Sequence, residues 1–480
     1  MYTTDELIIE KEKLEFGTLI SNSQRHRETL FQEYKDKLKI NRHINRSLIS
    51  FQANKNEPFY RWFKYKEGFS STFVKYILNL FGTPGSGQTV LDPFAGIGTT
   101  VTASIQNGYN ATGIELLPPG ILATKARIAA SRIIRNDFSN VLKSIENLNF
   151  QKNNIPQKYF FKHLTITKGA FSEETELAIA NVQKFIEEQC NNLEMKELLK
   201  FSVSSILEDV SFTRKDGQYL RWDYRSDRKL KSKFSKGEIF DFKPRLIQKL
   251  KDIQQDISQV KQKETNTTFH LIQGSCLTKM QEIADESIDL VITSPPYCNR
   301  YDYTRTYALE LAFNGINDNE IKKLRQTLLS ATVENKSKYN QLKKFYAEIH
   351  KSETFTNTFH SYINQLALQE VLENLRLHKN VLNNKNIPDM VANYFFEMNF
   401  VIRELARTLK KGGKIIMVND NVRYNGDEIP VDLILSEFAR ESGLAIDVIW
   451  VLERGKGNSS QQMGTHGRKE LRKCVYVWSK

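Results

Sequence analysis

Cysteine is scarce in this sequence of 480 residues. The four thiols, Cys190, Cys276, Cys298 and Cys474, lie far apart and form no CxxC pair. No histidine stands near them at the spacing of a zinc ligand, so the pattern excludes the usual structural zinc sites. So few cysteines also exclude a small fold stapled by disulfides. We therefore expect a reduced intracellular protein that binds no metal.

Long hydrophobic runs are absent as well. No stretch approaches the roughly 20 apolar residues that a membrane span requires. The N-terminal segment, MYTTDELIIEKEKLEF, lacks the apolar core of a signal peptide. These two absences predict a soluble, cytoplasmic protein with no membrane partner.

Acidic residues are outnumbered by basic ones. The sequence has 69 Lys and Arg against 56 Asp and Glu, which gives a formal net charge of +13. Such a charge suits a polyanionic partner such as nucleic acid, and it suits a solvated basic surface without a partner equally well. The motifs must decide between these two interpretations.

Short apolar runs alternate with helical patterns along much of the chain. The pattern predicts strands over residues 89–92, 111–115, 269–274, 290–293, 414–418, 446–452 and 473–478. Helices are expected over residues 71–81 and 99–107, and another is expected to stop at Gly412 and Gly413. This alternation indicates an α/β fold of the Rossmann type, with a mostly parallel, doubly wound sheet and helical insertions.

The composition divides the chain into an arm, a sheet-forming part and two insertions. Residues 1–55 are polar and favour helix, and we interpret them as an N-terminal helical arm. The sheet pattern covers residues 56–135 and 268–480. Two stretches rich in Lys, Gln and Asn interrupt it, at residues 136–267 and 314–386, and both are predicted to be helical.

A glycine loop, residues 92–98, stands between the strand at 89–92 and the helix at 99–107. Gly96 and Gly98 let the backbone approach a ligand closely, and Thr99 and Thr100 are expected to cap the helix. Glu115 ends the next strand, where a carboxylate can accept both hydroxyl hydrogens of a ribose. The residues expected to bind this ligand are Asp92, Pro93, Phe94, Ala95, Gly96, Gly98, Thr99, Thr100 and Glu115.

The same glycine pattern also marks dinucleotide dehydrogenases, and many glycine turns are only tight turns. Here Val101 stands where the third glycine of the dinucleotide fingerprint belongs. A pyrophosphate cradle is therefore less favoured than a nucleoside ligand without phosphates, such as S-adenosylmethionine.

A second motif, the SPPY loop (residues 294–297), follows the buried strand at 290–293. Pro295 and Pro296 fix an extended backbone and remove two amide donors, so this loop is rich in acceptors. Ser294 and the Pro295 carbonyl could accept the hydrogens of an exocyclic amine, and Tyr297 offers a face on which a base turned out of a duplex could stack. A proline turn with a core tyrosine is the plain structural alternative.

Together these motifs resemble those of the DNA amino-methyltransferases. Residues 92–98 are similar to that family's cofactor motif, and residues 294–297 to its catalytic motif. The resemblance implies the family's methyltransferase fold and methyl transfer from S-adenosylmethionine to a flipped base in double-stranded DNA. It also implies a restriction-modification or defence context, with a cognate endonuclease encoded separately. Residues 136–267 then form a possible DNA-recognition region within a catalytic domain of residues 56–135 and 268–480.

Further cofactor contacts are implied by the resemblance. Phe69 and Ser70 are similar to an additional cofactor motif that precedes the first strand. Ser275, followed by Cys276, stands where the family commonly has an acidic residue on the cofactor adenine.

The target base remains open between two classes. Serine at the first position of the catalytic motif is usual for cytosine N4 methylation, whereas Asp or Asn is usual for adenine N6. Many enzymes with the Ser variant carry the two motifs in the reverse order, so adenine N6 stays an alternative here. Methylation of an RNA amine would use the same two loops. A nucleic-acid-binding protein on a decayed enzyme fold would be expected to have lost Ser294, Tyr297 or the glycines of the first loop.

Six arginines and one tyrosine in three segments are expected to contact DNA. The segments follow the SPPY loop, lie within the first insertion, or belong to a late amide-rich loop. In chain order, the candidates are Arg214, Arg221, Arg300, Tyr303, Arg305, Arg454 and Arg468. A purely helical scaffold is an equally good interpretation of the first insertion.

Overall fold

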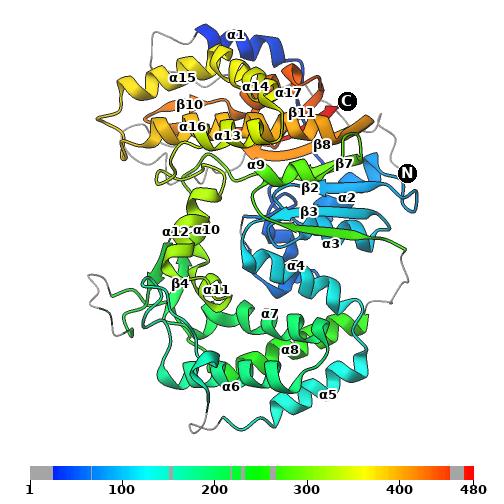
Figure 1. The fold of residues 1–480 in the computed structure, drawn as a ribbon, viewed down its shortest axis with the longest axis vertical. Coiled ribbons are helices and arrows are strands. Elements are labelled where there is room, and N and C mark those ends of the chain that lie inside the picture. Colours follow the sequence, from blue (N-terminus) through cyan, green and yellow to red (C-terminus); the bar gives the residue numbers. More distant parts are fainter. Residues whose placement is uncertain are drawn as a thin grey trace.

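The computed structural model describes residues 25–65, 67–150, 155–216, 219–226, 228, 233–259, 266–453 and 470–480. An eight-stranded sheet forms the centre of the molecule (Figure 1). Its strands, in spatial order, are β1 (Leu38–Ile40), β11 (Ala445–Val451), β12 (Lys473–Ser479), β8 (Leu409–Asp420), β7 (Ile288–Thr293), β2 (Thr89–Asp92), β3 (Asn110–Glu115) and β6 (Phe269–Gln273). β12 is antiparallel to both of its neighbours, and the other pairs are parallel. The predicted Rossmann-like, mostly parallel sheet is confirmed.

Each face of the sheet packs against its own apolar core. Val90 and Ile416 belong to one buried cluster, whereas their chain neighbours Leu91 and Ile415 belong to the other, because successive side chains of a strand point to opposite faces. The Val90 face carries α2 (Ser71–Phe81), α3 (Thr99–Gln106) and α4 (Pro118–Ala130). The Leu91 face carries α9 (Cys276–Lys279), α16 (Ile387–Thr408) and α17 (Val431–Glu441).

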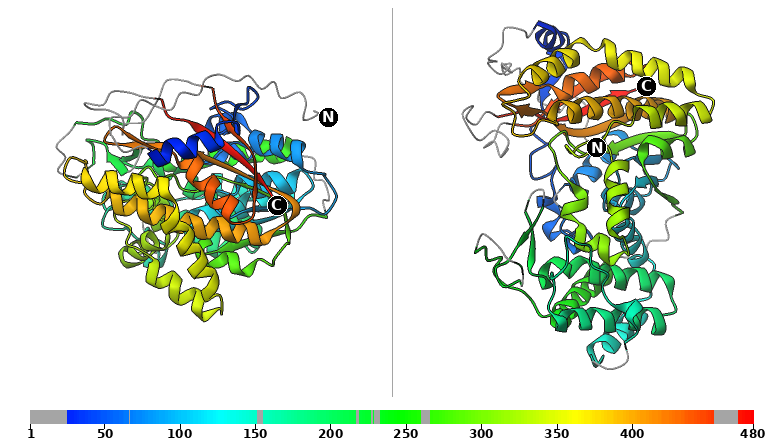
Figure 2. Two further views of the ribbon diagram at one scale, coloured as in Figure 1. Left: turned by 90° about the horizontal axis from the view of Figure 1, so that it is seen from above. Right: turned by 60° about the vertical axis from the view of Figure 1, so that its left-hand side comes forward.

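The described residues between 135 and 259 form a helical lobe, which lies below the sheet in Figure 1 and in the right-hand view of Figure 2. Its elements are α5 (Arg135–Glu146), α6 (Glu173–Gln189), α7 (Leu193–Val210), the antiparallel hairpin β4 (Thr213–Asp216) and β5 (Tyr219–Trp222), and α8 (Phe242–Gln259). The hairpin interrupts a stretch for which the sequence predicts only helices.

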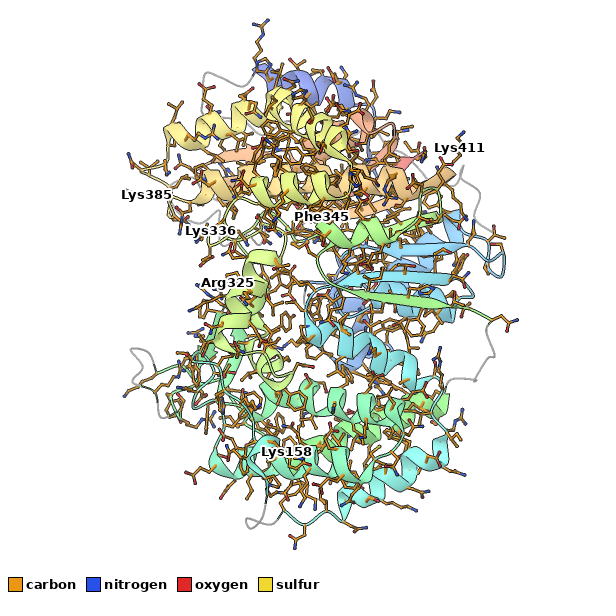
Figure 3. All side chains as sticks on the ribbon, in the orientation of Figure 1. Lys158, Arg325, Lys336, Phe345, Lys385 and Lys411 are labelled. Atoms are coloured by element: carbon orange, nitrogen blue, oxygen red, sulfur yellow. The ribbon has the colours of Figure 1, made fainter. Side chains whose placement is uncertain are left out.

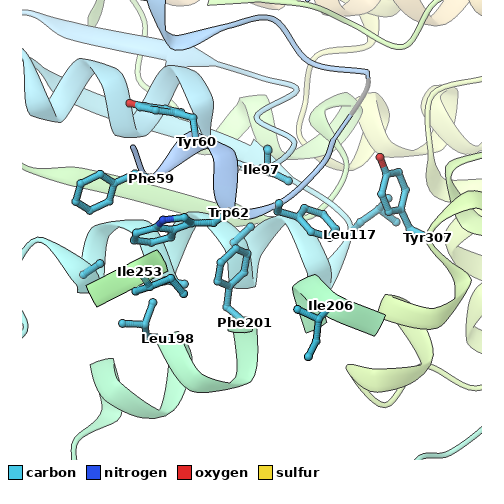
Figure 4. Close-up of a cluster of buried hydrophobic side chains, with 14 of the residues drawn as sticks. Phe59, Tyr60, Trp62, Ile97, Leu117, Leu198, Phe201, Ile206, Ile253 and Tyr307 are labelled. Atoms are coloured by element: carbon cyan, nitrogen blue, oxygen red, sulfur yellow. The ribbon is translucent and has the colours of Figure 1, made fainter. Parts of the chain in front are cut away.

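An aromatic segment, residues 59–63, joins the helical lobe to the sheet. The ring centre of Trp62 lies 4.8 Å from that of Phe59 and 6.3 Å from that of Phe201 on α7, and Ile97 of the glycine loop belongs to the same buried cluster (Figure 4). The fully buried carboxylate of Asp256 on α8 accepts hydrogen bonds from the Phe59 amide at 3.1 Å and the Trp62 indole at 2.7 Å. Sheet and lobe therefore share one core.

The later helices of the second predicted helical stretch cover the Leu91 face of the sheet. After the SPPY loop the chain forms α10 (Tyr303–Thr306), α11 (Ala308–Phe313), α12 (Asp318–Thr327), α13 (Tyr339–Glu348), α14 (Ser352–Asn364) and α15 (Leu366–Leu377). α14 and α15 pack on α16, and α1 (Arg25–Tyr34) packs on α15. A small hairpin, β9 (Val422–Tyr424) and β10 (Asp427–Ile429), follows β8.

Two local predictions were wrong. The helix expected to stop at Gly412 and Gly413 ends at Thr408, and the glycines lie inside β8. They lie where the register of the pairing with β7 shifts, since Ile288 pairs with Leu409 but Leu290 pairs with Lys414. The N-terminal arm also supplies β1 to the sheet edge, a three-residue strand too short to show alternation.

Among the helices that the structure describes, none combines the length and apolar character that a membrane crossing requires.

Candidate active site

A pocket opens at the carboxyl ends of β2, β3 and β7, where open α/β sheets bind their ligands. Residues 92–97 of the glycine loop line it, together with Glu115, Ser294 and Pro296. Its other lining residues from strand ends and loops are Thr99, Ile114, Leu116, Leu117, Gly274, Ser275 and Cys276, and from the remaining segments Tyr65, Glu67, Gly68, Phe69, Tyr303, Leu328 and Leu329. The two loops singled out in the sequence thus face the same cavity.

The glycine loop turns through two left-handed residues, Gly96 with φ of 53° and Gly98 with φ of 72°. A Cβ on Gly98 would lie 2.2 Å from Thr124 Oγ1 on α4, so only glycine fits there. α3 begins without a side-chain cap, contrary to the prediction for Thr99 and Thr100. Thr100 Oγ1 instead donates to the Ile292 carbonyl of β7 at 3.1 Å.

The absence of a third glycine in this loop has a structural counterpart on β3. Val101 packs against Gly113, where an added Cβ would lie 2.7 Å from Val101 Cγ2. The close approach of helix and strand that a third glycine on the helix would permit is therefore supplied by a glycine on the strand.

Two buried carboxylates stand at the pocket. Glu115 Oε1 accepts the Leu117 amide at 2.6 Å, and burial raises the pKa of Glu115 to about 7. Asp92 Oδ1 accepts the Thr293 hydroxyl at 2.7 Å and the Phe94 amide at 3.0 Å, and burial raises the pKa of Asp92 to about 6. Both side chains can therefore change charge near neutral pH.

A hydrogen bond ties the glycine loop to the strand residue that precedes the SPPY loop. Thr293, whose hydroxyl binds Asp92, directly precedes Ser294. Within the SPPY loop the Ser294 hydroxyl lies 3.3 Å from the Tyr297 hydroxyl. Burial raises the pKa of Tyr297, so this phenol stays neutral, and Lys473 Nζ lies 5.7 Å from the centre of its ring. Pro295 is buried, while Ser294, Pro296 and Tyr297 are partly exposed.

Several residues predicted to bind the cofactor do not line the pocket. Ser70 is fully buried as the N-cap of α2, where its hydroxyl accepts the Phe73 amide and donates to the Leu48 carbonyl. Gly98 of the glycine loop and Thr100 of α3 are both absent from the pocket lining. Phe69, Ser275 and Cys276 do line the cavity, and the Ser275 hydroxyl donates to the Thr327 carbonyl at 3.2 Å.

The predicted DNA contacts fall in different places. Arg214 and Arg221 face each other across the β4–β5 hairpin, and Arg214 is exposed. Arg300 donates to Asn383, and Arg305 pairs with Asp302 and Glu334. Tyr303 lies in the pocket wall. Arg454 and Arg468 lie outside the described residues.

Comparison with known proteins places the chain in a family. The model of the DNA methylase family (N6_N4_Mtase) matches residues 7–119. The type II methyltransferase M.AvaI of Nostoc sp. strain PCC 7120 is 43% identical over 483 residues, covering 97% of this chain and 95% of the relative, and that of Anabaena variabilis matches equally. The type II methyltransferase M.BsoBI of Geobacillus stearothermophilus is 42% identical over 455 residues, covering 91% of this chain and 88% of the relative.

The chain belongs to the type II DNA methyltransferase family. It is therefore a site-specific DNA methyltransferase of the restriction-modification kind. No solved structure matches it.

Sequence reasoning missed part of the pocket wall of this methyltransferase. Tyr65 and Glu67 belong to an aromatic-rich stretch before the first motif, and that density of aromatics was a usable signal. Leu328 and Leu329 reach the pocket from the second helical stretch, where two adjacent leucines carry no signal of their own.

Proposed function

We propose that this enzyme transfers a methyl group from S-adenosylmethionine to the exocyclic N4 of a cytosine turned out of double-stranded DNA. The observation that carries the proposal is the shared pocket of the glycine loop and Ser294. A methyl donor held by the glycine loop would present its methyl group to an amine held by Ser294.

The donor set of the pocket fits S-adenosylmethionine. Glu115 offers a carboxylate at the end of β3 for the ribose hydroxyls, as in other Rossmann-like sites. Leu117, Leu329 and Cys276 offer apolar surface for the adenine. Gly96 leaves its backbone open to the ligand, with Tyr65 as its nearest side-chain neighbour. When bound, S-adenosylmethionine supplies an electrophilic methyl group.

The SPPY loop would prepare the amine for attack. The Ser294 hydroxyl and the Pro295 carbonyl would accept the two amine hydrogens and draw the nitrogen lone pair out of the ring. In such a transfer the new N–C bond would form as the methyl–sulfur bond of the donor breaks, and the nitrogen would release one proton to an adjacent acceptor or to solvent. Orientation of the two reactants supplies much of the acceleration in such a step.

Cytosine is proposed on the strength of Ser294 at the first position of the motif. Tyr297 would stack on the flipped base, a role that its partial exposure permits. Adenine N6 is the alternative, since both bases present an exocyclic amine to the same acceptors.

DNA contact is proposed for the outer face of the β4–β5 hairpin, within the predicted recognition region of residues 136–267. This face carries Arg214 and the exposed Tyr219. Arg221 and Arg228 lie over the rings of Phe234 and Trp222, at 3.9 Å and 3.8 Å from their centres. Figure 3 shows Lys336 and Lys385, both exposed, on the same side of the molecule as β4 in Figure 1. A cognate endonuclease, encoded separately, would cut the same site when unmethylated.

The test is mass spectrometry of nucleosides from DNA incubated with the enzyme and S-adenosylmethionine, with RNA as a parallel substrate. N4-methylcytosine is expected in DNA, and Ser294→Ala should abolish it while S-adenosylmethionine still binds. N6-methyladenine would overturn the choice of base, and methylation of RNA alone would overturn DNA as the substrate.

A further inference from the structure

Lys215 on β4 carries a buried ammonium group. Its side chain is 6% exposed and pairs with Glu310 of α11, which is 1% exposed. Lys215 Nζ also lies 4.5 Å from the ring centre of Tyr307 and 4.9 Å from that of Phe63. A buried cation is costly unless an anion and aromatic faces compensate for the lost water, and all of these surround it.

The contacts of Tyr307 continue from Lys215 to the pocket wall. The Tyr307 hydroxyl donates to Glu67 Oε2 at 2.5 Å, and its ring stacks on Tyr65 with centres 4.9 Å apart. Tyr65 and Glu67 line the pocket beside the glycine loop. Tyr65 Cε1 lies 3.3 Å from the place that a Cβ on Gly96 would occupy. Tyr307 therefore fixes two side chains of the pocket.

In the other direction, Lys215 directly follows Arg214, which lies on the exposed outer face of the hairpin. Arg214, its chain neighbour, points to the opposite side because side chains alternate along a strand. The Lys215 amide donates to Glu208 of α7 at 2.9 Å, which anchors the strand at this residue. A ligand that fixes Arg214 also fixes the backbone from which Lys215 reaches Tyr307.

We propose that Lys215 is a positioning residue that couples the DNA-facing side of the β4–β5 hairpin to the cofactor pocket. DNA held on the hairpin would stabilise this arrangement of Lys215 and Tyr307 and, through them, the Tyr65 and Glu67 wall. The cofactor would then bind more tightly to the DNA complex than to the free enzyme, and DNA more tightly to the cofactor complex by the same factor. This inference rests on the proposed function, namely S-adenosylmethionine in the pocket and DNA on the hairpin.

The test compares the dissociation constant of S-adenosylhomocysteine, a non-reacting analogue of the donor, with and without a plasmid that the enzyme methylates. In wild type, the plasmid should tighten binding about fivefold or more, the range typical of coupled sites. Lys215→Met keeps the length of the side chain without its charge. It should bring the ratio of the two dissociation constants, without and with the plasmid, close to one. Lys215→Arg keeps the charge and should restore part of the coupling.

A matched control comes from Lys243 of α8, whose Nζ also lies over an aromatic ring, 5.3 Å from the centre of Phe150, but which contacts no pocket residue among those described. Lys243→Met should behave as wild type. Tyr307→Phe provides a second test if Lys215→Met does not fold, since it removes only the hydroxyl bond to Glu67 and should lower the ratio.

The outcomes separate the two proposals. A wild-type enzyme that binds no analogue overturns the cofactor assignment and with it this inference. A wild-type ratio of one, or an unchanged ratio in folded Lys215→Met, overturns the coupling alone. For methylation at saturating DNA, Lys215→Met should raise the KM for S-adenosylmethionine more than it lowers kcat.

Discussion

Single buried polar groups hold the glycine loop of this methyltransferase in place. The guanidinium of Arg127 on α4 is fully buried and donates to the carbonyls of Phe59 at 3.2 Å and Ile97 at 2.5 Å. It also lies over the ring of Tyr60, 5.2 Å from its centre, and burial lowers the pKa of Arg127 to about 10. One side chain thus fixes the loop and the aromatic segment together.

Replacement of Arg127 by Met should lower the unfolding midpoint in urea and weaken cofactor binding. Two buried carbonyls would lose their donor, at about 1–3 kcal/mol each, and relief of the buried charge would offset part of this. We expect a net loss near 2 kcal/mol. Arg127→Lys, which retains a donor, should lose less, and equal stability of Arg127→Met and wild type would contradict this role.

Cofactor binding should depend on pH through Glu115, whose pKa is raised to about 7. If the ionised carboxylate binds the ribose, the affinity follows its ionised fraction and rises about tenfold between about pH 6 and about pH 8. The free energy of unfolding of the free enzyme should change the opposite way. Its native state holds the extra proton between the unfolded pKa and the folded one, so this contribution falls as pH rises through that window.

Titration calorimetry at several pH values measures the pH dependence of binding, with Glu115→Gln as the comparison. Asp92, with a pKa raised to about 6, titrates in an overlapping window, so the profile of wild type alone does not identify the group. If the affinity of Glu115→Gln for the cofactor still rises with pH, the pH dependence belongs to another group.

At the scale of elements, the β4–β5 hairpin presents two different faces. Lys215 and Leu220 are buried on one side, whereas Arg214 and Tyr219 are exposed on the other. Such a division suits an element that is anchored to the lobe and available to a polyanion.

Arg214→Ala should reduce the salt dependence of DNA binding. Each phosphate contact contributes about 0.9 to the slope of log affinity against log salt, so the loss of one contact should lower the slope by about that amount. Fluorescence anisotropy of a labelled duplex over a salt series measures it. Lys411→Ala, at an exposed site on the other side of the molecule in Figure 3, is the control and should leave the slope unchanged.

The sequence predicted the elements that have strong local patterns, but it did not predict contacts between residues far apart in the chain. Strands β2, β3, β7 and β12 were predicted within two residues because buried strands are short apolar runs between turn signals. The pocket was predicted from its two loops because parallel strands end at the same sheet edge. Leu329 and Tyr307 reach the site through tertiary packing, and the role of Ser70 was misread because an N-cap serine and a ligand-binding serine look alike in sequence.

At the scale of the whole molecule, the helical lobe and the sheet are one folding unit. Ile97 and Leu117 beside the pocket share a buried cluster with Phe201 and Leu250 of the lobe. Asp256 of the lobe accepts the Phe59 amide and Arg127 of α4 donates to the Phe59 carbonyl, so both hold the aromatic segment.

Differential scanning calorimetry of the free enzyme should therefore show one endotherm rather than two. The lobe cannot unfold without exposing the surface on which the glycine loop rests, so its melting should also abolish cofactor binding at the same temperature. A separate, earlier transition of the lobe that leaves S-adenosylmethionine bound would contradict a shared core.

All four cysteines are buried, and Cys276 is one of the pocket residues. A maleimide dye reacts with accessible thiols, so we expect it to label the native enzyme very little. Tyr219→Cys on the hairpin would create an accessible labelling site without removal of any natural cysteine. A fluorophore there would follow the hairpin in real time as DNA arrives, and the unlabelled parent would supply the blank.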